Sequence, residues 1–324
     1  MAVGKLPDFI SCLRFMMAAK KHLMYFYSVK EPDSPTSEQL EIERQAALLR
    51  NIVERLYLSE GVSCYVLKNI PQEELPTSSD QTHTGVEVII IPQVHKLSKD
   101  EQNVLVRMMR SSQVSRPVRL FVGMISWNTT KESAMSGNIE LALSSRITSE
   151  DWLKHKFWFA SYEPNENELF SPLTETTSES IGGEIQYTDV HVNRSIHRYI
   201  LDIMIHLRMH KLVDTTKGGG IHTSALKDVL ILSQLIALCR FKKRFVTPEH
   251  VKLACIWYFP LHIEILKGST MDASVLYGSR PELVEGMLKC IADVKLSKTV
   301  ETENPLFLET VVVQDVLNRV VPPV

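Results

Sequence analysis

Three histidines in the second half of the chain are the residues whose spacing most readily suggests metal chemistry. His206 and His210 are four residues apart, so a helix would place both on one face, and His197 lies upstream of them. A zinc site needs three or four ligands, and no third ligand stands at a convincing spacing. The pattern therefore favours ordinary helix histidines, and we expect neither a metal nor another cofactor.

The cysteines are a second set of reactive groups, but they are odd in number and widely scattered. No C-x-x-C pair occurs, and no histidine lies beside one at ligand spacing. The pattern predicts reduced, mostly buried thiols in an intracellular chain. The five are Cys12, Cys64, Cys239, Cys255 and Cys290.

Phosphate chemistry would need a glycine-rich loop that enters a helix and carries a lysine and a Ser or Thr. No G-x-x-x-x-G-K-S/T sequence occurs anywhere in the 324 residues. Before residue 86 the only glycines are Gly4, Gly61 and Gly85, and none opens such a loop. The usual cradle for a nucleotide is therefore missing from the sequence.

Composition is that of an ordinary globular protein, with 44% hydrophobic and 23% charged residues, and the length fits two domains. The formal charge of -2 gives no overall attraction to nucleic acid or membrane, so any electrostatic argument must be local. No apolar run approaches the roughly 18 to 20 residues that cross a bilayer. We expect a soluble chain without a membrane partner.

The first half of the chain combines helical and strand patterns. A β-branched run at 86–91 predicts a buried strand, and the next helix begins with Ser98 as N-cap and Glu101 at the capping-box position. With a second buried strand at 118–126 this makes a βαβ unit and an α/β fold. The spacing also predicts helices from Asp8 to about Tyr27 and over 40–58, and a strand over 61–70.

The second half is predicted to be all-helical from Arg194 onward, with Thr247 as an N-cap and Pro248 at the first helical position. Before it, the stretch between Phe157 and Asn193 has no Lys or Arg and seven acids, which is typical of a linker or surface loop. We expect an α/β core at 1–159, an acidic linker at 160–193, a helical domain at 194–270 and a helical tail at 271–324.

The string "IIIPQVHKLSKDEQNVLVRMM" resembles the Walker B strand and following helix of AAA+ ATPases, in particular the MoxR and magnesium-chelatase branch. "RLFVGMISWN" is similar to the sensor-1 strand with Asn128 at its tip, and "WLKHKF" to that branch's Leu-x-Asp-Arg-Phe segment. "RYILDIMIHLRMH" and "RFVTPEHVKLA" resemble its helical lid. The resemblance covers about 86–159 and 194–265. It implies an AAA+-like (P-loop NTPase-type) parallel-sheet core that lacks the P-loop, followed by an all-helical lid-like domain.

The groups that the resemblance would assign to catalysis are replaced. Pro92 stands where the family has its Mg²⁺-organising Asp, and Gln93, which cannot accept a proton at neutral pH, stands where it has the water-activating Glu. The family's Asp-Arg appears here as His155-Lys156, which leaves a finger-like Lys156. Around the glycine-rich loop, where the family has a sensor-2 arginine, Thr223 and Ser224 stand instead. The chain is therefore expected to be a pseudo-ATPase and not an enzyme, with a small-molecule substrate unexpected.

Longer strings resemble the fungal maintenance of telomere capping protein 2 family, over nearly the whole chain. They are "LPDFISCLRF", "WLKHKFWFA", "RYILDIMIHLR", "WYFPLHIEIL", "MDASVLYGSRPELV" and "ENPLFLETVVVQDVLNRVVPPV". The family's name implies a connection with telomere capping and supplies no biochemical activity. We expect a noncatalytic scaffold or adaptor that acts through contacts within a protein complex, in the nucleus or the cytoplasm.

A basic cluster suggests nucleic acid as an alternative partner. Between Arg194 and Arg244 ten Lys or Arg face three Asp, and the cluster "RFKKR" contains Arg240, Lys242, Lys243 and Arg244. The simpler interpretation is a solvated face whose charges favour a helix C-terminus, and the neighbouring Phe241 and Phe245 fit the core as well as the surface.

Three further patterns have two interpretations each. The glycines at 218–220 form either a flexible helix connection, which we favour, or an anion-binding nest. "HKFWFASY" is either a core strand, which we favour, or an aromatic recognition patch. In the tail, Val311, Val312, Val316 and Val320 form a helical stripe that either completes the helical core or docks a partner.

Overall fold

The computed structural model describes residues 6–29, 35–57, 61–70, 85–112, 117–128, 138–144, 151–163 and 186–323. The chain divides into two compact units, each with its own core. A sheet unit comprises 7–128 and 147–185, and a helical unit comprises 1–6, 129–146 and 186–324. Most of the stretch at 160–193 that was expected to be a linker, namely 164–185, lies outside the described residues.

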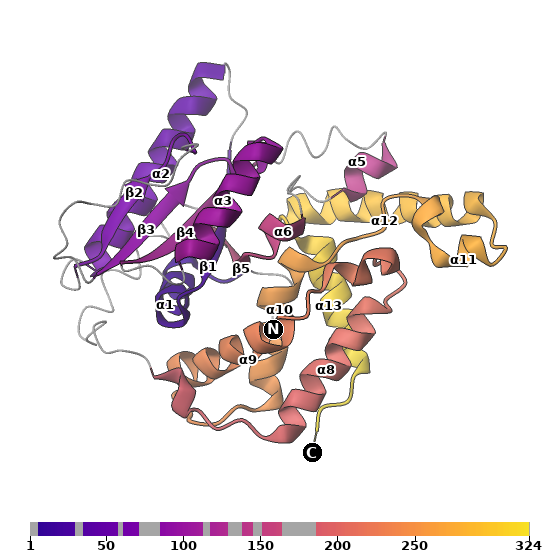
Figure 1. The fold of residues 1–324 in the computed structure, drawn as a ribbon. Helices are drawn as coiled ribbons and strands as arrows, with labels where there is room; N and C mark the ends of the chain where they lie inside the picture. The colour runs from indigo at the N-terminus through magenta and orange to yellow at the C-terminus, as the bar shows by residue number, and fades with distance from the viewer. Residues whose placement is uncertain are drawn as a thin grey trace. The chain divides into compact units, whose positions relative to one another are not determined.

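The sheet unit is built on five parallel strands in the order β2-β3-β4-β1-β5 (Figure 1). This confirms the α/β class. The strands are β1 (His22–Ser28), β2 (Ser63–Val66), β3 (Val86–Ile91), β4 (Val118–Trp127) and β5 (Phe157–Glu163).

The predicted βαβ unit is confirmed. β3 pairs in parallel with β4 from Val86 opposite Val118 to Ile91 opposite Gly123, and the connecting helix is α3 (Lys99–Ser112). The capping box is also present, since Ser98 N–H donates to Glu101 Oε2 at 2.8 Å and Glu101 N–H donates to Ser98 Oγ at 3.4 Å.

The prediction of a helix that reaches Tyr27 is wrong for the second half of that stretch. Helix α1 (Phe9–Ala19) ends at Lys20, whose φ of 53° is left-handed, and β1 follows directly. β1 is flanked by β4 and β5, and all of its residues but Ser28 are buried. In a helix, this aromatic run would leave one side in water. In the central strand, both of its faces are covered.

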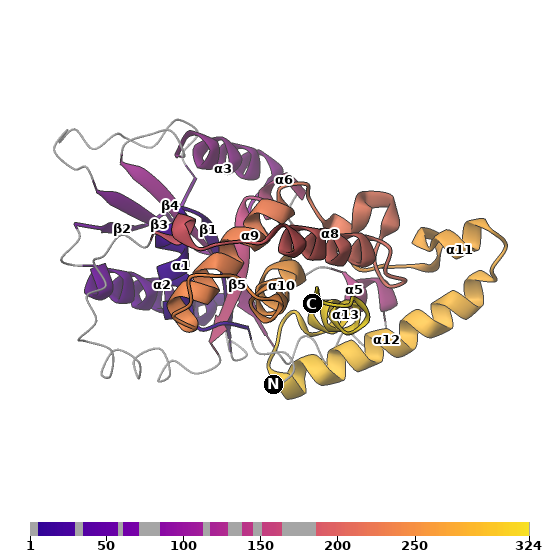
Figure 2. The ribbon, with the colours of Figure 1, turned by 90° about the horizontal axis from the view of Figure 1, so that it is seen from below.

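Helices cover both faces of the sheet. α1 and α2 (Pro35–Tyr57) lie on one face, while α3 lies on the other (Figure 2). α2 begins earlier than the expected residue 40, and β2 is shorter than the predicted strand at 61–70. A short helix, α6 (Asp151–Lys154), precedes β5. The burial of β5 confirms the interpretation of "HKFWFASY" as a core strand.

The helical unit confirms the expected all-helical second half. As predicted, α10 (Pro248–His262) has Thr247 as its N-cap and Pro248 at its first position. The Thr247 N–H donates to His250 Nδ1 at 3.2 Å. Helix α9 continues into a π-helical turn, Ile236–Arg240. The helices are α5 (Ile139–Leu143), α8 (Arg194–Arg208), α9 (Ala225–Leu235), α10 (Pro248–His262), α11 (Ala273–Leu276), α12 (Pro281–Thr302) and α13 (Phe307–Arg319).

One segment among the described residues, Gly218–Arg240, is long and apolar enough to cross a membrane by length and composition. It escaped the sequence inspection because polar residues interrupt the apolar ones. Its most apolar window is 61% buried inside the unit, as for the core helix of a globular domain, which passes the same test. The segment is therefore weak evidence for a membrane span.

Candidate functional site

The carboxyl ends of the strands are where a parallel α/β sheet binds ligands, and Pro92 and Gln93 lie at this edge. β3 ends at Ile91, Pro92 follows, and Gln93 has a left-handed φ of 51°. Gln93 Nε2 donates to Glu38 Oε1 at 3.5 Å, and Lys96 Nζ lies 2.8 Å from the same oxygen. The Glu38 carboxylate, which contacts Gln93, is therefore also paired with Lys96.

Asn128, the sensor-1-like residue, follows β4 at the same edge. Ile91 is level with Gly123, so Asn128 lies four residues further along the strand direction than Pro92. At about 3.3 Å per residue this is roughly 13 Å along the strand. Beside it, Val29 N–H donates to Trp127 O at 2.8 Å. The two positions therefore share an edge without forming one compact cluster.

Lys156 lies at the other edge of the sheet. It directly precedes Phe157, which pairs with His22 at the start of β1, so Lys156 stands at the amino ends of the strands. Burial and the nearby charges of Arg110 and Lys21 lower the pKa of Lys156. Within this chain Lys156 is thus remote from Pro92, Gln93 and Asn128, because a strand's length separates the two edges.

Of the two positions that stand where a sensor-2 arginine is expected, Ser224 belongs to a polar cluster in the helical unit. Thr223 is exposed, and Ser224 Oγ donates to Asp228 Oδ2 at 3.3 Å. The buried Tyr258 hydroxyl donates to the same oxygen at 3.4 Å, and its pKa is raised well above the usual value by burial and by Asp228. This cluster joins α9 to α10 and explains Ser224 by packing.

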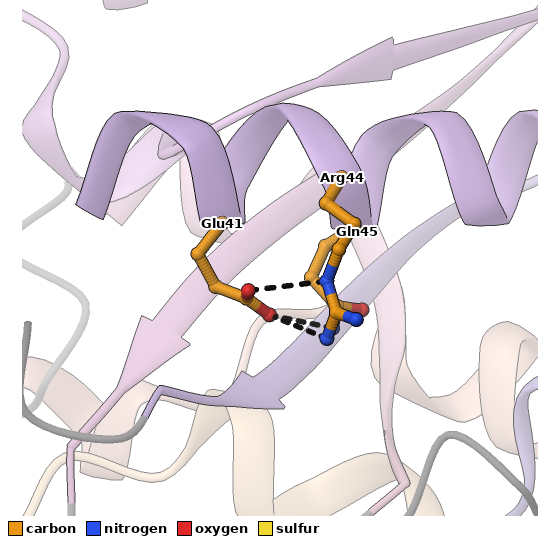
Figure 3. A network of polar contacts seen from close by, with 3 residues as sticks. All are labelled: Glu41, Arg44 and Gln45. Carbon is orange, nitrogen blue, oxygen red and sulfur yellow. Dashed lines mark hydrogen bonds and ion pairs between the residues drawn. The ribbon is translucent and has the colours of Figure 1, made fainter. Parts of the chain in front are cut away.

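Helix α2, whose Glu38 contacts Gln93, also carries a polar network of its own. Arg44 donates to both carboxylate oxygens of Glu41, with Nε–Oε2 and Nη2–Oε1 distances of 3.1 Å, and Gln45 Nε2 donates to Oε1 at 3.1 Å (Figure 3). Glu41 is thereby occupied by two side chains of its own helix. The network is a helix-stabilising arrangement that leaves little acceptor capacity for a ligand.

The basic cluster begins at Arg240, the last residue of the π-helical segment, and continues into the turn that follows. Arg240, Lys242, Lys243 and Arg244 are all exposed, and Lys242 has a left-handed φ of 54°. The turn is held by backbone hydrogen bonds, since His191 N–H donates to Arg244 O at 2.9 Å and Val246 N–H donates to His191 O at 3.0 Å. The cluster is thus presented by an ordered turn.

Two aromatic side chains lie among these charges. Phe241 is 42% exposed and Phe245 50% exposed, so neither is a core residue. Lys243 Nζ lies 5.7 Å from the centre of the Phe245 ring, and the Arg240 guanidinium 5.8 Å from that of Trp257. The repeat of aromatic and basic residues in "RFKKRF" was a signal that sequence inspection undervalued, because only the turn keeps both rings at the surface.

The tail valines lie in the core of the helical unit. Val312, Val316 and Val320 are 1%, 2% and 7% exposed, and α13 packs against α8, α10 and α12. This is the core alternative for the stripe. Their side chains offer no exposed docking surface in this structure.

No group of three or more His, Cys, Asp or Glu side chains able to hold a metal occurs among the described residues. His197 Nδ1 and His206 Nδ1 each lie beside a backbone carbonyl four residues earlier, Asn193 O at 3.3 Å and Asp202 O at 2.7 Å. His210 faces α13, where its Nε2 lies 3.0 Å from Asp315 Oδ2. The three histidines thus make helix-end and packing contacts and do not converge.

Together these features define a two-unit α/β protein in which Pro92 and Gln93 directly follow β3 and whose sequence has no G-x-x-x-x-G-K-S/T loop. The family profile described as "Maintenance of telomere capping protein 2, N-terminal domain" matches residues 7–162, which begins with the sheet unit and ends in β5. The chain belongs to the maintenance of telomere capping protein 2 family.

Three relatives, each named maintenance of telomere capping protein 2, support this membership along the full length. The Zygosaccharomyces rouxii protein is 82% identical over 324 residues, with 100% of both chains covered. A Saccharomyces cerevisiae protein is 36% identical, with 98% of this chain and 99% of its own covered. The Vanderwaltozyma polyspora protein is 29% identical, with 99% and 98% covered.

Proposed function

We propose that this chain is a noncatalytic scaffold or adaptor that takes part in telomere capping through contacts with other proteins. The names of its relatives, at up to 82% identity over the whole chain, support the connection with capping. The proposal includes a core derived from the AAA+ ATPases that has kept the sheet and lost the chemistry. A direct effect on telomeres requires that the protein be present in the nucleus. Fluorescence microscopy of the tagged protein would test this location.

The observation that carries the noncatalytic part is the end of β3. A strand that organises Mg²⁺ and activates water needs carboxylates at its carboxyl end, but Pro92 has no side-chain oxygen and Gln93 is an amide engaged with Glu38. Glu38 itself is paired with Lys96 at 2.8 Å. Since the sequence also has no glycine-rich phosphate loop, one restored residue would not supply the missing groups.

Isothermal titration of the purified chain with Mg-ATP tests this part. We expect no binding at micromolar nucleotide, for the chain as it is and for the variant Pro92→Asp/Gln93→Glu. Micromolar binding by the unaltered chain would overturn the noncatalytic proposal.

The scaffold part is tested by affinity purification of the tagged chain from its own cells, followed by quantitative mass spectrometry. We expect a complex recovered in stoichiometric amount that contains telomere components. Recovery of no protein above background would contradict the scaffold role, whatever the result with nucleotide.

The exposed turn at 240–245 favours a second candidate function, binding of single-stranded nucleic acid. Bases stack on exposed aromatic rings while Lys and Arg contact the phosphates, and Phe241 and Phe245 stand exposed among four basic side chains. The test is fluorescence anisotropy with labelled single strands at several salt concentrations. Affinity should fall steeply with salt because counterions are released.

Two sets of variants distinguish a specific site from general charge. Lys242→Glu/Lys243→Glu/Arg244→Glu and Phe241→Ala/Phe245→Ala should each weaken binding at least tenfold. The matched control replaces three exposed basic residues of α3 with Glu, namely Lys99, Arg107 and Arg110. Equal losses from the control and from the triple variant of the turn would exclude this site.

A further inference from the structure

Helix α12 has two apolar faces, one of which packs against other described helices of its own unit. The inner face is buried and lies against α5 and α13. Its apolar residues are Val284, Leu288, Ala292 and Leu296, at 9%, 1%, 3% and 6% exposure. Among the described residues, α12 is therefore held through its inner face.

The second face is an exposed stripe, which we define as Leu283, Met287, Cys290 and Val294. Leu283 is 71%, Met287 36% and Val294 54% exposed, and Cys290 is exposed as well. In Figure 2 the side of α12 turned away from α5 and α13 faces outward. Four such residues along one side of a helix make a contiguous apolar patch of the kind that marks an interaction site.

The spacing of the stripe is that of a two-stranded coiled coil. Its members are separated by four, three and four residues, which is the alternation of d and a positions in a heptad repeat. Leu276 in α11, seven residues before Leu283, is 81% exposed, and the next residue, Tyr277, is 91% exposed. Exposed apolar side chains thus also precede α12 in the chain.

Charges beside the stripe indicate what covers it. With Leu283 at a d position, Asp293 falls at g and Lys298 at the following e. In two parallel helices a g residue faces the e residue five positions later on the other helix. Asp293 would therefore face Lys298 of the partner subunit, and a two-fold axis would repeat the pair. An antiparallel pair centred on the stripe would instead place Asp293 opposite Gly286 of the partner subunit, without a charge pair.

We propose that the exposed stripe of α12 binds the same stripe of a second copy of this chain, with the two helices parallel. The pairs of Asp293 with Lys298 set the direction. Lys298 contacts Glu301 of its own helix at the surface, and such exposed ion pairs exchange at little cost. This inference goes beyond the proposed function and needs neither the telomere role nor the loss of catalysis.

Affinity is expected to be modest. A stripe of four side chains is small beside a standard interface of about 800 Å² per partner, so a dissociation constant in the micromolar range is appropriate. Sedimentation velocity of the full chain from about 1 to 100 µM should show a monomer of 36.9 kDa converting to a dimer. A monomer throughout this range would overturn the proposal.

Substitution of the stripe provides the first specific test. Leu283→Glu/Val294→Glu should keep the chain monomeric, with at least a tenfold weaker association. The control is Lys289→Glu/Glu282→Lys, which changes exposed residues of α12 outside the stripe. An unchanged thermal melt shows that the variant still folds. If the stripe variant associates like the control, the stripe is not a dimer interface. The same holds if the unaltered chain is a monomer and the variant only lowers the melting temperature.

Charge reversal tests the direction of the helices. In a parallel dimer Asp293→Lys alone and Lys298→Asp alone place like charges opposite each other and should weaken association several-fold, while the double variant should restore it. A short bismaleimide should also join two chains through Cys290, and Cys290→Ser should abolish the product. Failure of the double variant to recover association would contradict the parallel arrangement.

Discussion

The imidazole of His22 accepts a hydrogen bond from the backbone N–H of Phe121, with an Nδ1–N distance of 3.2 Å, inside the sheet between β1 and β4. His22 is 3% exposed, and its ring meets the Phe121 ring edge to face at 5.2 Å. An acceptor at Nδ1 requires that nitrogen to stay unprotonated. The first residue of the central strand is thus held as a neutral histidine.

This relationship predicts an acid limb of stability. Burial, with smaller effects from Lys21 and Lys156, lowers the pKa of His22 from 6.5 to about 3. Below about pH 6.5 the unfolded chain takes up a proton that the folded chain does not, so stability falls with decreasing pH down to about pH 3, by up to roughly 1.4 kcal/mol per pH unit.

Urea unfolding between pH 7.5 and 4.5 measures this dependence. His22→Asn keeps an acceptor near the Phe121 N–H and removes the titration, so the variant should lose much of the slope. His95, whose pKa burial lowers to about 4, contributes to the slope that remains. An identical slope in both proteins would contradict the assignment to His22.

A second prediction concerns the contact between His210 and α13. His210 Nδ1 accepts from Leu212 N–H at 3.3 Å, which leaves Nε2–H to donate to Asp315 Oδ2 at 3.0 Å. His210→Ala and Asp315→Ala should each lower the free energy of unfolding by about 1 to 2 kcal/mol. In a double-mutant cycle the two changes should couple by about 0.5 kcal/mol or more, and additive losses would show that the contact is not energetically significant.

The glycine triplet gives a third prediction with an internal control. Gly220 has a φ of 72°, and a Cβ there would lie 2.3 Å from the backbone oxygen of His262. Gly218 has a similar φ of 61°, but no atom lies within 4 Å of its Cβ position. Gly218→Ala therefore bears only the strain of a left-handed backbone, about 1 kcal/mol, whereas Gly220→Ala must also displace the end of α10.

Thermal unfolding of the two glycine variants compares these costs. We expect Gly220→Ala to lose at least about 2 kcal/mol more than Gly218→Ala. Equal losses would mean that close packing is not why glycine stands at 220.

The fourth prediction concerns the buried ion pair between α12 and α13. Lys295 Nζ lies 3.6 Å from Glu309 Oε1, and the two side chains are only 2% and 6% exposed. Glu309→Leu leaves a buried lysine without its partner and should cost about 3 to 5 kcal/mol, while Lys295→Met/Glu309→Leu should recover most of the loss. Chemical denaturation of both variants decides this, and a double variant no more stable than the single one would show that the charge is not the cause.

The sequence by itself determined the elements whose signals are local. The β-branched run of β3, the capping box of Ser98 and Glu101, and the proline after Thr247 depend on neighbours within a few residues, so strand, helix start and helix cap could be predicted. The lack of a G-x-x-x-x-G-K-S/T sequence and the absence of acidic residues at Pro92 and Gln93 were likewise visible in the sequence. Family membership followed from long strings of residues.

Tertiary structure decided what depends on partners distant in the chain. Residues 22–28 form a strand because β4 and β5 lie on either side, which no local periodicity reveals. Parallel pairing placed Lys156 at the amino edge of the sheet, away from Pro92. Packing buried Val312 and left Leu283 exposed, although both belong to apolar stripes with helical spacing. Spacing fixes which side chains share a face, but only the packed chain determines which faces remain in water.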